Sequence, residues 1–510
     1  MVSRRNYFSI FLTILVIFFL FQGTIVVRER WNQYDDNNSV NYSSLKGSLK
    51  WKQNSSSTIP NADNASGFVV YIGDQDYDTF NVARQWAEYN KKNFFAYEQI
   101  EEYEVNGRVP DDLLIDGKII NDDDKALYLT DLVRKDRCDV IFMDLPEMKM
   151  LKSNSNLKDL LGINLIKGDN VQIEGIHFFD GFLFGGEKIY KAETEADEKK
   201  QDLDLNVPWL VTLNGTKTYA VGMMEENPAD ESQNEYLPAI IWRHSLGDQK
   251  VFGVNGDYMK NVYSGIGIRD AMFYEMNDYV LYPIINAQTL ILPGFPVLAD
   301  ENVEKMNEIY RRDQTQFEKD IMLSSIISLV TNTNFHMTSF LLPQYSYTDD
   351  IEAKDEILEY YLKEFNESDS EMGISLLHTG GNNNQVMDYI KDYLDDQDID
   401  YNFNAIYGLS NEDFRKGHTL LKDIHTIVRE CDSDDKIVDY INDDVTLQTI
   451  TSDARKHSYM GNIKLMGIET ALGYSNIEMN VLPSLWPQNE EDEWQKLSKE
   501  EMSNVATYWS

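Results

Sequence analysis

Short apolar runs alternate with helix-like segments along most of this chain, and this alternation constrains the fold more than any other feature. The runs at 68–73, 94–97 and 139–144 are short and rich in β-branched and aromatic residues, and the segments at about 79–90 and 125–134 have helical patterns. Such runs, bounded by glycine and acidic residues, favour buried strands rather than helices. Strands that alternate with helices favour a parallel sheet covered on both faces. We therefore predict an α/β fold.

The length and charge of the chain limit its organisation and its partners. At 510 residues it has room for two to four domains of roughly 100–200 residues each. It carries 86 Asp and Glu against 46 Lys and Arg, a formal net charge of -40. Binding to phosphate backbones needs a basic surface, so we exclude nucleic acid as a partner. A cationic polymer would be attracted instead.

The amino-terminal part contains a long apolar segment, Tyr7–Val27. About 20 apolar residues suffice to cross a bilayer. We predict that residues 1–30 form a cytoplasmic tip and a transmembrane anchor, that 31–66 form a disordered polar tether, and that the globular part lies outside the cytoplasm. A cleaved signal peptide is the alternative, although no A-x-A-like site follows the apolar segment. The predicted localisation is the cell membrane, with a single pass.

Residues 67–260 form the first predicted globular domain. The stretch PAIIWRHSLGDQKVFGVNGD (238–257) resembles the end of class I glutamine amidotransferase-like domains. That resemblance implies a flavodoxin-like, doubly wound sheet. Enzymes of that superfamily need a cysteine nucleophile on a tight strand-to-helix turn. Here the strand at 139–144 runs into Leu145-Pro146 without a cysteine. We interpret this domain as structural or ligand-binding.

Residues 261–510 form the second predicted domain, and the stretch 372–384 is its most informative part. An apolar run is followed by His378, Thr379 and a Gly380-Gly381 pair. In α/β sheets and barrels, functional groups gather where the strands end. The alternative is a short buried strand followed by an Asn-rich turn without a functional role.

The phrase EMGISLLHTGGN and the strand FHMTSFLLP (335–343) resemble motifs of the polysaccharide deacetylase (NodB-homology) family. The resemblance implies a distorted (β/α) barrel, either degenerate or cut short at its end. It places His378 on the first motif histidine, Thr379 on the hydroxyl residue and Asn382 where a second histidine belongs. Asn286 falls where the family carries an aspartate.

Deacetylases of this family hold one divalent, zinc-like metal with one Asp and two His. By the resemblance, only His378 remains of that ligand set. Asparagine coordinates a metal weakly and cannot act as a general base. We therefore assign His378 as a candidate metal ligand, and Thr379, Asn382 and Asn286 as candidate polymer-binding residues.

As a whole, the chain resembles a membrane-anchored bacterial family associated with Pel-type exopolysaccharide machinery, with IIWRHSLGDQKVFGVNGDYM and YPIINAQTL carrying the likeness. This implies an amino-sugar exopolysaccharide and its export machinery as partners. Three functions follow as hypotheses: a degenerate deacetylase-like protein that binds or scaffolds the polymer, an active metal-dependent N-deacetylase, or a membrane-tethered sensor or solute-binding protein.

Overall fold

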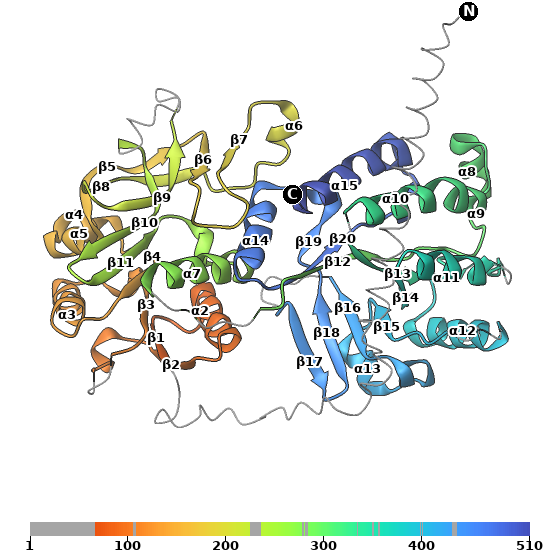
Figure 1. Ribbon diagram of the computed structural model, residues 1–510, viewed down its shortest axis with the longest axis horizontal. Coiled ribbons are helices and arrows are strands. Elements are labelled where there is room, and N and C mark those ends of the chain that lie inside the picture. The colour runs from red at the N-terminus through yellow and green to blue at the C-terminus, as the bar shows by residue number, and fades with distance from the viewer. Residues whose placement is uncertain are drawn as a thin grey trace, which may run out of the picture. The chain divides into compact units, whose positions relative to one another are not determined.

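The computed structural model describes residues 67–105, 109–224, 236–277, 280, 284–333, 335–348, 351–354, 357–397, 399, 401–430 and 436–509. Residues Ser56–Ser510 belong to one compact unit. It contains two nine-stranded sheets and one small two-stranded sheet among the described residues (Figure 1).

The first sheet begins as a doubly wound parallel sheet, in the order β2-β1-β3-β4-β11, and continues antiparallel through β10-β9-β6-β7. Its strands are β1 (Phe68–Ile72), β2 (Asn93–Tyr97), β3 (Asp112–Asp116), β4 (Val140–Asp144), β6 (Gly175–Phe178), β7 (Lys188–Lys191), β9 (Lys217–Met223), β10 (Ala239–Leu246) and β11 (Gln249–Val254). The small sheet pairs β5 (Ile163–Gln172) with β8 (Asn206–Thr212). The parallel strands follow the order of a doubly wound sheet.

Helices cover both faces of the first sheet, and for this reason its parallel strands are apolar over most of their length. Along β1, Val69 and Tyr71 point to one core, while Val70 and Ile72 point to the other. The helices are α2 (Asp78–Tyr89), α3 (Asp123–Arg134), α4 (Met148–Ser153), α5 (Ser155–Leu161), α6 (Glu195–Glu198) and α7 (Val262–Met276). Helices α2 and α7 contribute to the first core, and α3 and α5 to the second.

The second sheet is wound as a (β/α) barrel but remains open. Its order is β17-β18-β16-β15-β14-β13-β12-β20-β19, and all neighbours are parallel except β17 with β18. The strands are β12 (Ala287–Leu292), β13 (His336–Leu341), β14 (Glu371–Ser375), β15 (Ala405–Tyr407), β16 (Thr426–Arg429), β17 (Val438–Asn442), β18 (Val445–Thr449), β19 (Ser452–Asp453) and β20 (Tyr474–Glu478). Strands β17 and β19 end the sheet, so in the described residues it forms a half-barrel.

The helices of the second sheet pack on one of its faces. They are α8 (Val303–Tyr310), α9 (Gln314–Phe317), α10 (Leu323–Thr333), α11 (Ile357–Glu367), α12 (Asn383–Asp396), α13 (Asn411–Lys416), α14 (Tyr459–Thr470) and α15 (Trp494–Trp509). A π-helical turn, Glu318–Met322, joins α9 to α10. The opposite face carries only a small cluster of buried apolar residues, among them Ile291, Phe340 and Tyr407.

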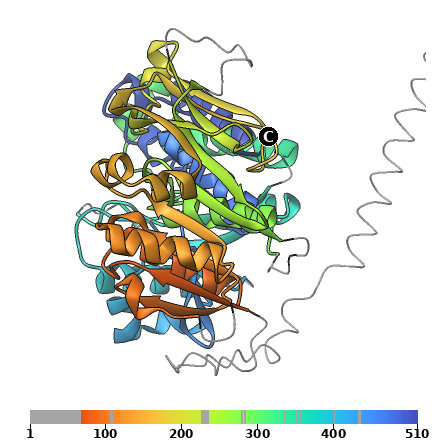
Figure 2. The ribbon, with the colours of Figure 1, turned by 90° about the vertical axis from the view of Figure 1, so that its left-hand side faces the viewer.

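Helix α14 lies between β19 and β20 in sequence, yet it packs against α7 and completes the core of the first sheet (Figure 1). In Figure 2 the blue α14 appears behind the yellow and green strands of that sheet. Tyr459 Oη donates to Lys191 O at 2.9 Å, and Phe184 N donates to Thr470 Oγ1 at 2.9 Å. Helices α7 and α14 both follow residue 260, where the domain boundary is predicted, yet both cover an apolar face of the first sheet.

The predicted membrane anchor needs correction. Among the described residues, no helix has the length and apolarity needed to cross a membrane. The predicted segment Tyr7–Val27 and the tether at 31–66 lie outside those residues. The α/β part of the predicted fold class stands, as a doubly wound sheet joined to a half-barrel, but its transmembrane helix and the single-pass localisation have no support in the structure.

Candidate functional site

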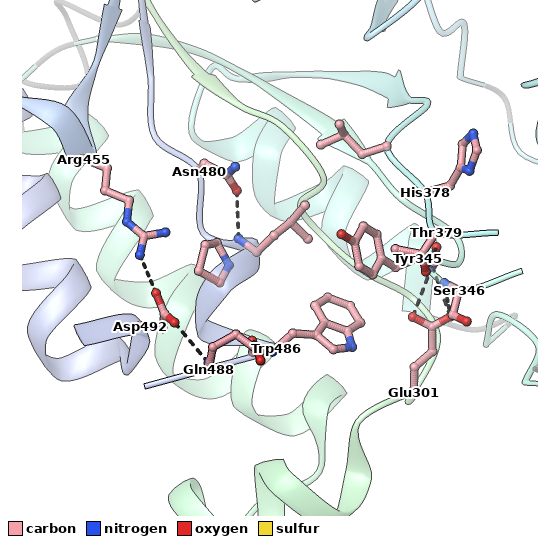
Figure 3. Close-up of a pocket in the computed structure, with 13 residues that line it drawn as sticks. Glu301, Tyr345, Ser346, His378, Thr379, Arg455, Asn480, Trp486, Gln488 and Asp492 are labelled. Carbon is pink, nitrogen blue, oxygen red and sulfur yellow. Dashed lines mark hydrogen bonds and ion pairs between the residues drawn. The ribbon is translucent and has the colours of Figure 1, made fainter. Parts of the chain in front are cut away.

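A pocket of about 720 Å³ lies at the carboxyl edge of the half-barrel. Its lining comes from the loops that follow β12, β13, β14 and β20, and from the 3₁₀ turns Ala454–Lys456 and Glu490–Asp492. Parallel neighbours bring these loops to one edge of the sheet, which is where (β/α) barrels carry their ligand sites. Figure 3 shows the lining side chains.

Two aromatic side chains form the centre of the pocket wall. Tyr345 follows β13 and Trp486 follows β20, and their ring centroids lie 4.6 Å apart at an interplanar angle of 44°. Both side chains are half-buried. Aromatic rings with one exposed face offer a large apolar surface, and nearby polar groups can then fix the orientation of a ligand.

Glu301 fixes the loop that carries Tyr345. The backbone N–H of Ser346 donates to Glu301 Oε1 at 2.8 Å, and that of Tyr345 donates to Oε1 and Oε2 at 3.1 and 3.2 Å (Figure 3). Carboxylates that accept backbone N–H groups make strong charge-assisted hydrogen bonds. The loops after β12 and β13 therefore form one rigid wall.

A second polar group lies across the aromatic pair. Arg455 forms an ion pair with Asp492, and Gln488 N donates to Asp492 Oδ2 at 3.0 Å. Burial of Asp492 opposes its ionisation, but the hydrogen bonds from Gln488 and Arg455 outweigh it and lower the pKa of this carboxyl. In Figure 3 this group stands on one side of Trp486 and Glu301 on the other, so polar groups flank the rings. Asn480 also lines the pocket.

His378 lies at the carboxyl end of β14 and lines the pocket, but both of its ring nitrogens already have partners. Nδ1 lies 2.8 Å from Gly380 O and Nε2 lies 2.9 Å from Asn383 Oδ1. The amide of Asn383 is oriented in turn, because its Nδ2 donates to Asp413 Oδ2 at 2.8 Å. In this conformation neither nitrogen presents a lone pair to the pocket.

The other three predicted residues are dispersed. Thr379 lines the pocket and pairs with the loop after β13, its N–H donating to Tyr345 O at 2.8 Å. Asn382 caps α12, since its Oδ1 accepts from Gln385 N at 3.1 Å. Asn286 lies just before β12, at the amino edge of the sheet and opposite to the pocket. The structure therefore brings together His378 and Thr379 but not Asn286.

The side chains present do not fit the metal that the deacetylase resemblance implies. Within the described part of the chain, no group of three or more His, Cys, Asp or Glu side chains could hold a metal ion. The two ring nitrogens of His378 point at oxygen atoms of Gly380 and Asn383, and Asn286 lies at the other edge of the sheet. The metal predicted from the resemblance is thus without a ligand set in this conformation, and we derive no chemical step through it.

Sequence reasoning missed Trp486, Tyr345, Glu301 and the Arg455–Asp492 pair. Tyr345 could have been found from the sequence, because it lies two residues after the predicted strand 335–343, at a strand end like that of His378. The segment that carries Trp486 gave no such signal, since the pairing of β20 with β12 spans most of the second half of the chain.

No protein-family model matches the chain, and no curated protein sequence matches it either. Among solved structures, the crystal structure of Agd3, a novel carbohydrate deacetylase, matches with a TM-score of 0.48 and 9% sequence identity. The match covers 81% of this chain and 78% of that chain.

Proposed function

We propose that the pocket binds a segment of an amino-sugar polysaccharide, and that the protein acts by holding this polymer rather than by hydrolysing it. The observation that carries the proposal is the aromatic pair Tyr345–Trp486 between flanking polar groups at the carboxyl edge of the half-barrel. The C–H face of a pyranose ring packs on an exposed aromatic ring, and its hydroxyl and amide groups need hydrogen-bond partners. Glu301, Asn480 and Gln488 supply such partners.

The charge of the molecule supports an amino-sugar polymer in particular. A polymer with some free amino groups is cationic, and the chain carries a formal net charge of -40. Complementary charge raises the rate of encounter and stabilises the complex at low salt. The predicted association with an export machinery stays a prediction.

Calorimetric titration tests the proposal, with glucosamine oligomers of six residues that are fully or partly N-acetylated. We expect saturable binding, stronger at low salt for the partly acetylated oligomer, and weakened in Trp486→Ala. The matched control is Trp209→Ala, in β8 of the small sheet, which should bind as the wild type does. Absence of binding to both oligomers at low salt would contradict the proposal.

Two further measurements on the same oligomers separate the alternative functions, an N-deacetylase and a sensor or solute-binding protein. Acetate released from the N-acetylated oligomer would show an N-deacetylase instead. Binding of a single sugar as strong as that of the hexamer would favour a sensor or solute-binding protein.

A further inference from the structure

A carboxyl group is buried directly behind the wall of the pocket. Glu318 begins the π-helical turn between α9 and α10, and its side chain is fully buried, with 0% exposed. Its Oε2 accepts from the backbone N–H of Val297 at 2.9 Å, and its Oε1 accepts from Gln314 Nε2 at 3.3 Å. Val297 lies in the loop that leads from β12 to the pocket residue Glu301.

This loop, residues 297–301, is held to the helices behind it at two points. One is the hydrogen bond from Val297 to Glu318. The other is Asp300, whose Oδ1 accepts from Thr315 N at 2.9 Å and from Thr315 Oγ1 at 2.7 Å, and which pairs with Lys354. Glu301 follows at once and holds the loop that carries Tyr345. Glu318 is thus one of the contacts that place the loop 297–301, and with it the aromatic wall, beside the backbone hydrogen bond from Leu298 N to Leu342 O at 3.1 Å.

Glu318 has no cation in direct contact among the described residues, so its charge state is set by burial. Burial raises the pKa of Glu318 to about 8, and the negative charge of Asp300 adds to this rise. The hydrogen bonds from Val297 and Gln314 and the positive charge of Lys354 act in the opposite direction and lower the pKa. Tyr361 of α11 also faces Glu318 and is buried, and burial and Glu318 raise its pKa in turn. Below this pH the carboxyl is neutral. Above it, a second negative charge stands behind the loop beside Asp300.

We infer that Glu318 is a positioning residue of the glycan pocket, whose neutral carboxyl suits the buried site behind the loop 297–301. Its ionisation would place a buried charge, with no cation in direct contact in the described part of the chain, beside Asp300, and this loosens the loop and weakens binding. For its ligand the inference rests on the proposed function. The neutral form is also the one that the neighbouring side chain accommodates, because Gln314 Oε1 is buried without a hydrogen-bond partner. Rotation of the Gln314 amide by a half turn exchanges its nitrogen, which now donates to Glu318, for this oxygen. A protonated carboxyl can donate to the oxygen in that orientation, whereas a carboxylate cannot.

The first test measures affinity for the fully N-acetylated glucosamine hexamer from pH 6 to pH 9, since the charge of this probe does not change with pH. One pH unit above a pKa, about one molecule in ten remains protonated, so the dissociation constant should rise about tenfold at pH 9. Glu318→Gln should bind at pH 7 as the wild type does and lose this pH dependence, because the amide can also donate to Gln314. Glu318→Ala should bind weakly at every pH. Glu304→Gln, an exposed residue of α8, is the matched control and should keep the wild-type profile.

The second test needs no ligand. Amide hydrogen exchange in the segments 297–301 and 345–346, corrected for the intrinsic effect of pH, should rise between pH 7 and pH 9 in the wild type but not in Glu318→Gln. If exchange rises in the wild type but not in Glu318→Gln, and the hexamer does not bind at any pH, the proposed function fails and the positioning role stands. If Glu318→Gln and the wild type share one pH profile in both measurements, Glu318 is not the titrating group and the inference is overturned.

Discussion

Replacing Gly267 by alanine would force helices α7 and α14 apart. A Cβ atom at Gly267 would lie 2.0 Å from Gly467 O and 2.3 Å from Gly467 Cα. Real Cβ atoms do not approach other atoms this closely, and backbone atoms cannot rotate out of the way as a side chain can. The two helices would have to separate by more than about 1 Å, at the contact that joins α14 to the first sheet.

The expected cost follows from that geometry. Added atoms in a well-packed core cost typically about 1–3 kcal/mol, and a clash with backbone belongs at the upper end, so we expect about 3 kcal/mol. Urea unfolding followed by tryptophan fluorescence and by far-ultraviolet circular dichroism measures the loss. Because Ser56–Ser510 form one compact unit, both signals should shift together.

Gly168→Ala in β5 is the matched control. A Cβ atom there would meet only Asn170 O, at 3.8 Å. This variant should lie within about 0.5 kcal/mol of the wild type. Two results would refute this reasoning: a fall of less than about 1 kcal/mol in the free energy of unfolding of Gly267→Ala, or a shift in only one of the two signals.

Three further predictions concern the pocket. Trp486→Ala should weaken binding of the glucosamine hexamer at least about tenfold, since it removes the largest stacking surface; unchanged calorimetric affinity would disprove the stacking role. His378→Ala should leave the zinc content measured by elemental analysis unchanged, because both ring nitrogens are engaged within the protein; stoichiometric zinc in the wild type that disappears in the variant would restore the metal-ligand prediction. The pKa of Glu318 is raised on folding from 4.5 to about 8, so its stabilising contribution is present below the unfolded value and is lost as pH rises through the folded one. The free energy of unfolding should thus fall by on the order of 3 kcal/mol between pH 5 and pH 8 from this group, and chemical denaturation of Glu318→Gln should show a flatter profile.

Local patterns predicted several of the parallel strands, because these strands are buried on both faces along most of their length. The runs that contain β1, β4, β13 and β14 are apolar for this reason, and the position of His378 after β14 followed directly. Asn286 lies away from the pocket because β12 starts at Ala287, directly after it. The polar residue therefore lies where the strand begins rather than where it ends.

The rest depended on contacts between distant residues. Nothing near Trp486 indicates that β20 will lie beside β12 and so place this side chain opposite Tyr345. Helix α14 has apolar residues on several sides, such as Ile463, Leu465 and Ile468, since it packs in the cores of both sheets. Such a helix has no single apolar face from which a partner could be inferred.

The late position of α14 in the chain also bears on how the protein is made. Strands β1–β4 and helix α7 leave the ribosome early, whereas α14 follows roughly 180 residues after α7 ends. At translation rates of about 5–20 residues per second, one apolar face of the nascent first sheet stays only partly covered, by α2 and α7, for about 10–40 seconds. A holdase chaperone that binds exposed apolar surface would find its site there during this interval, and release would coincide with synthesis of the last strands of the half-barrel.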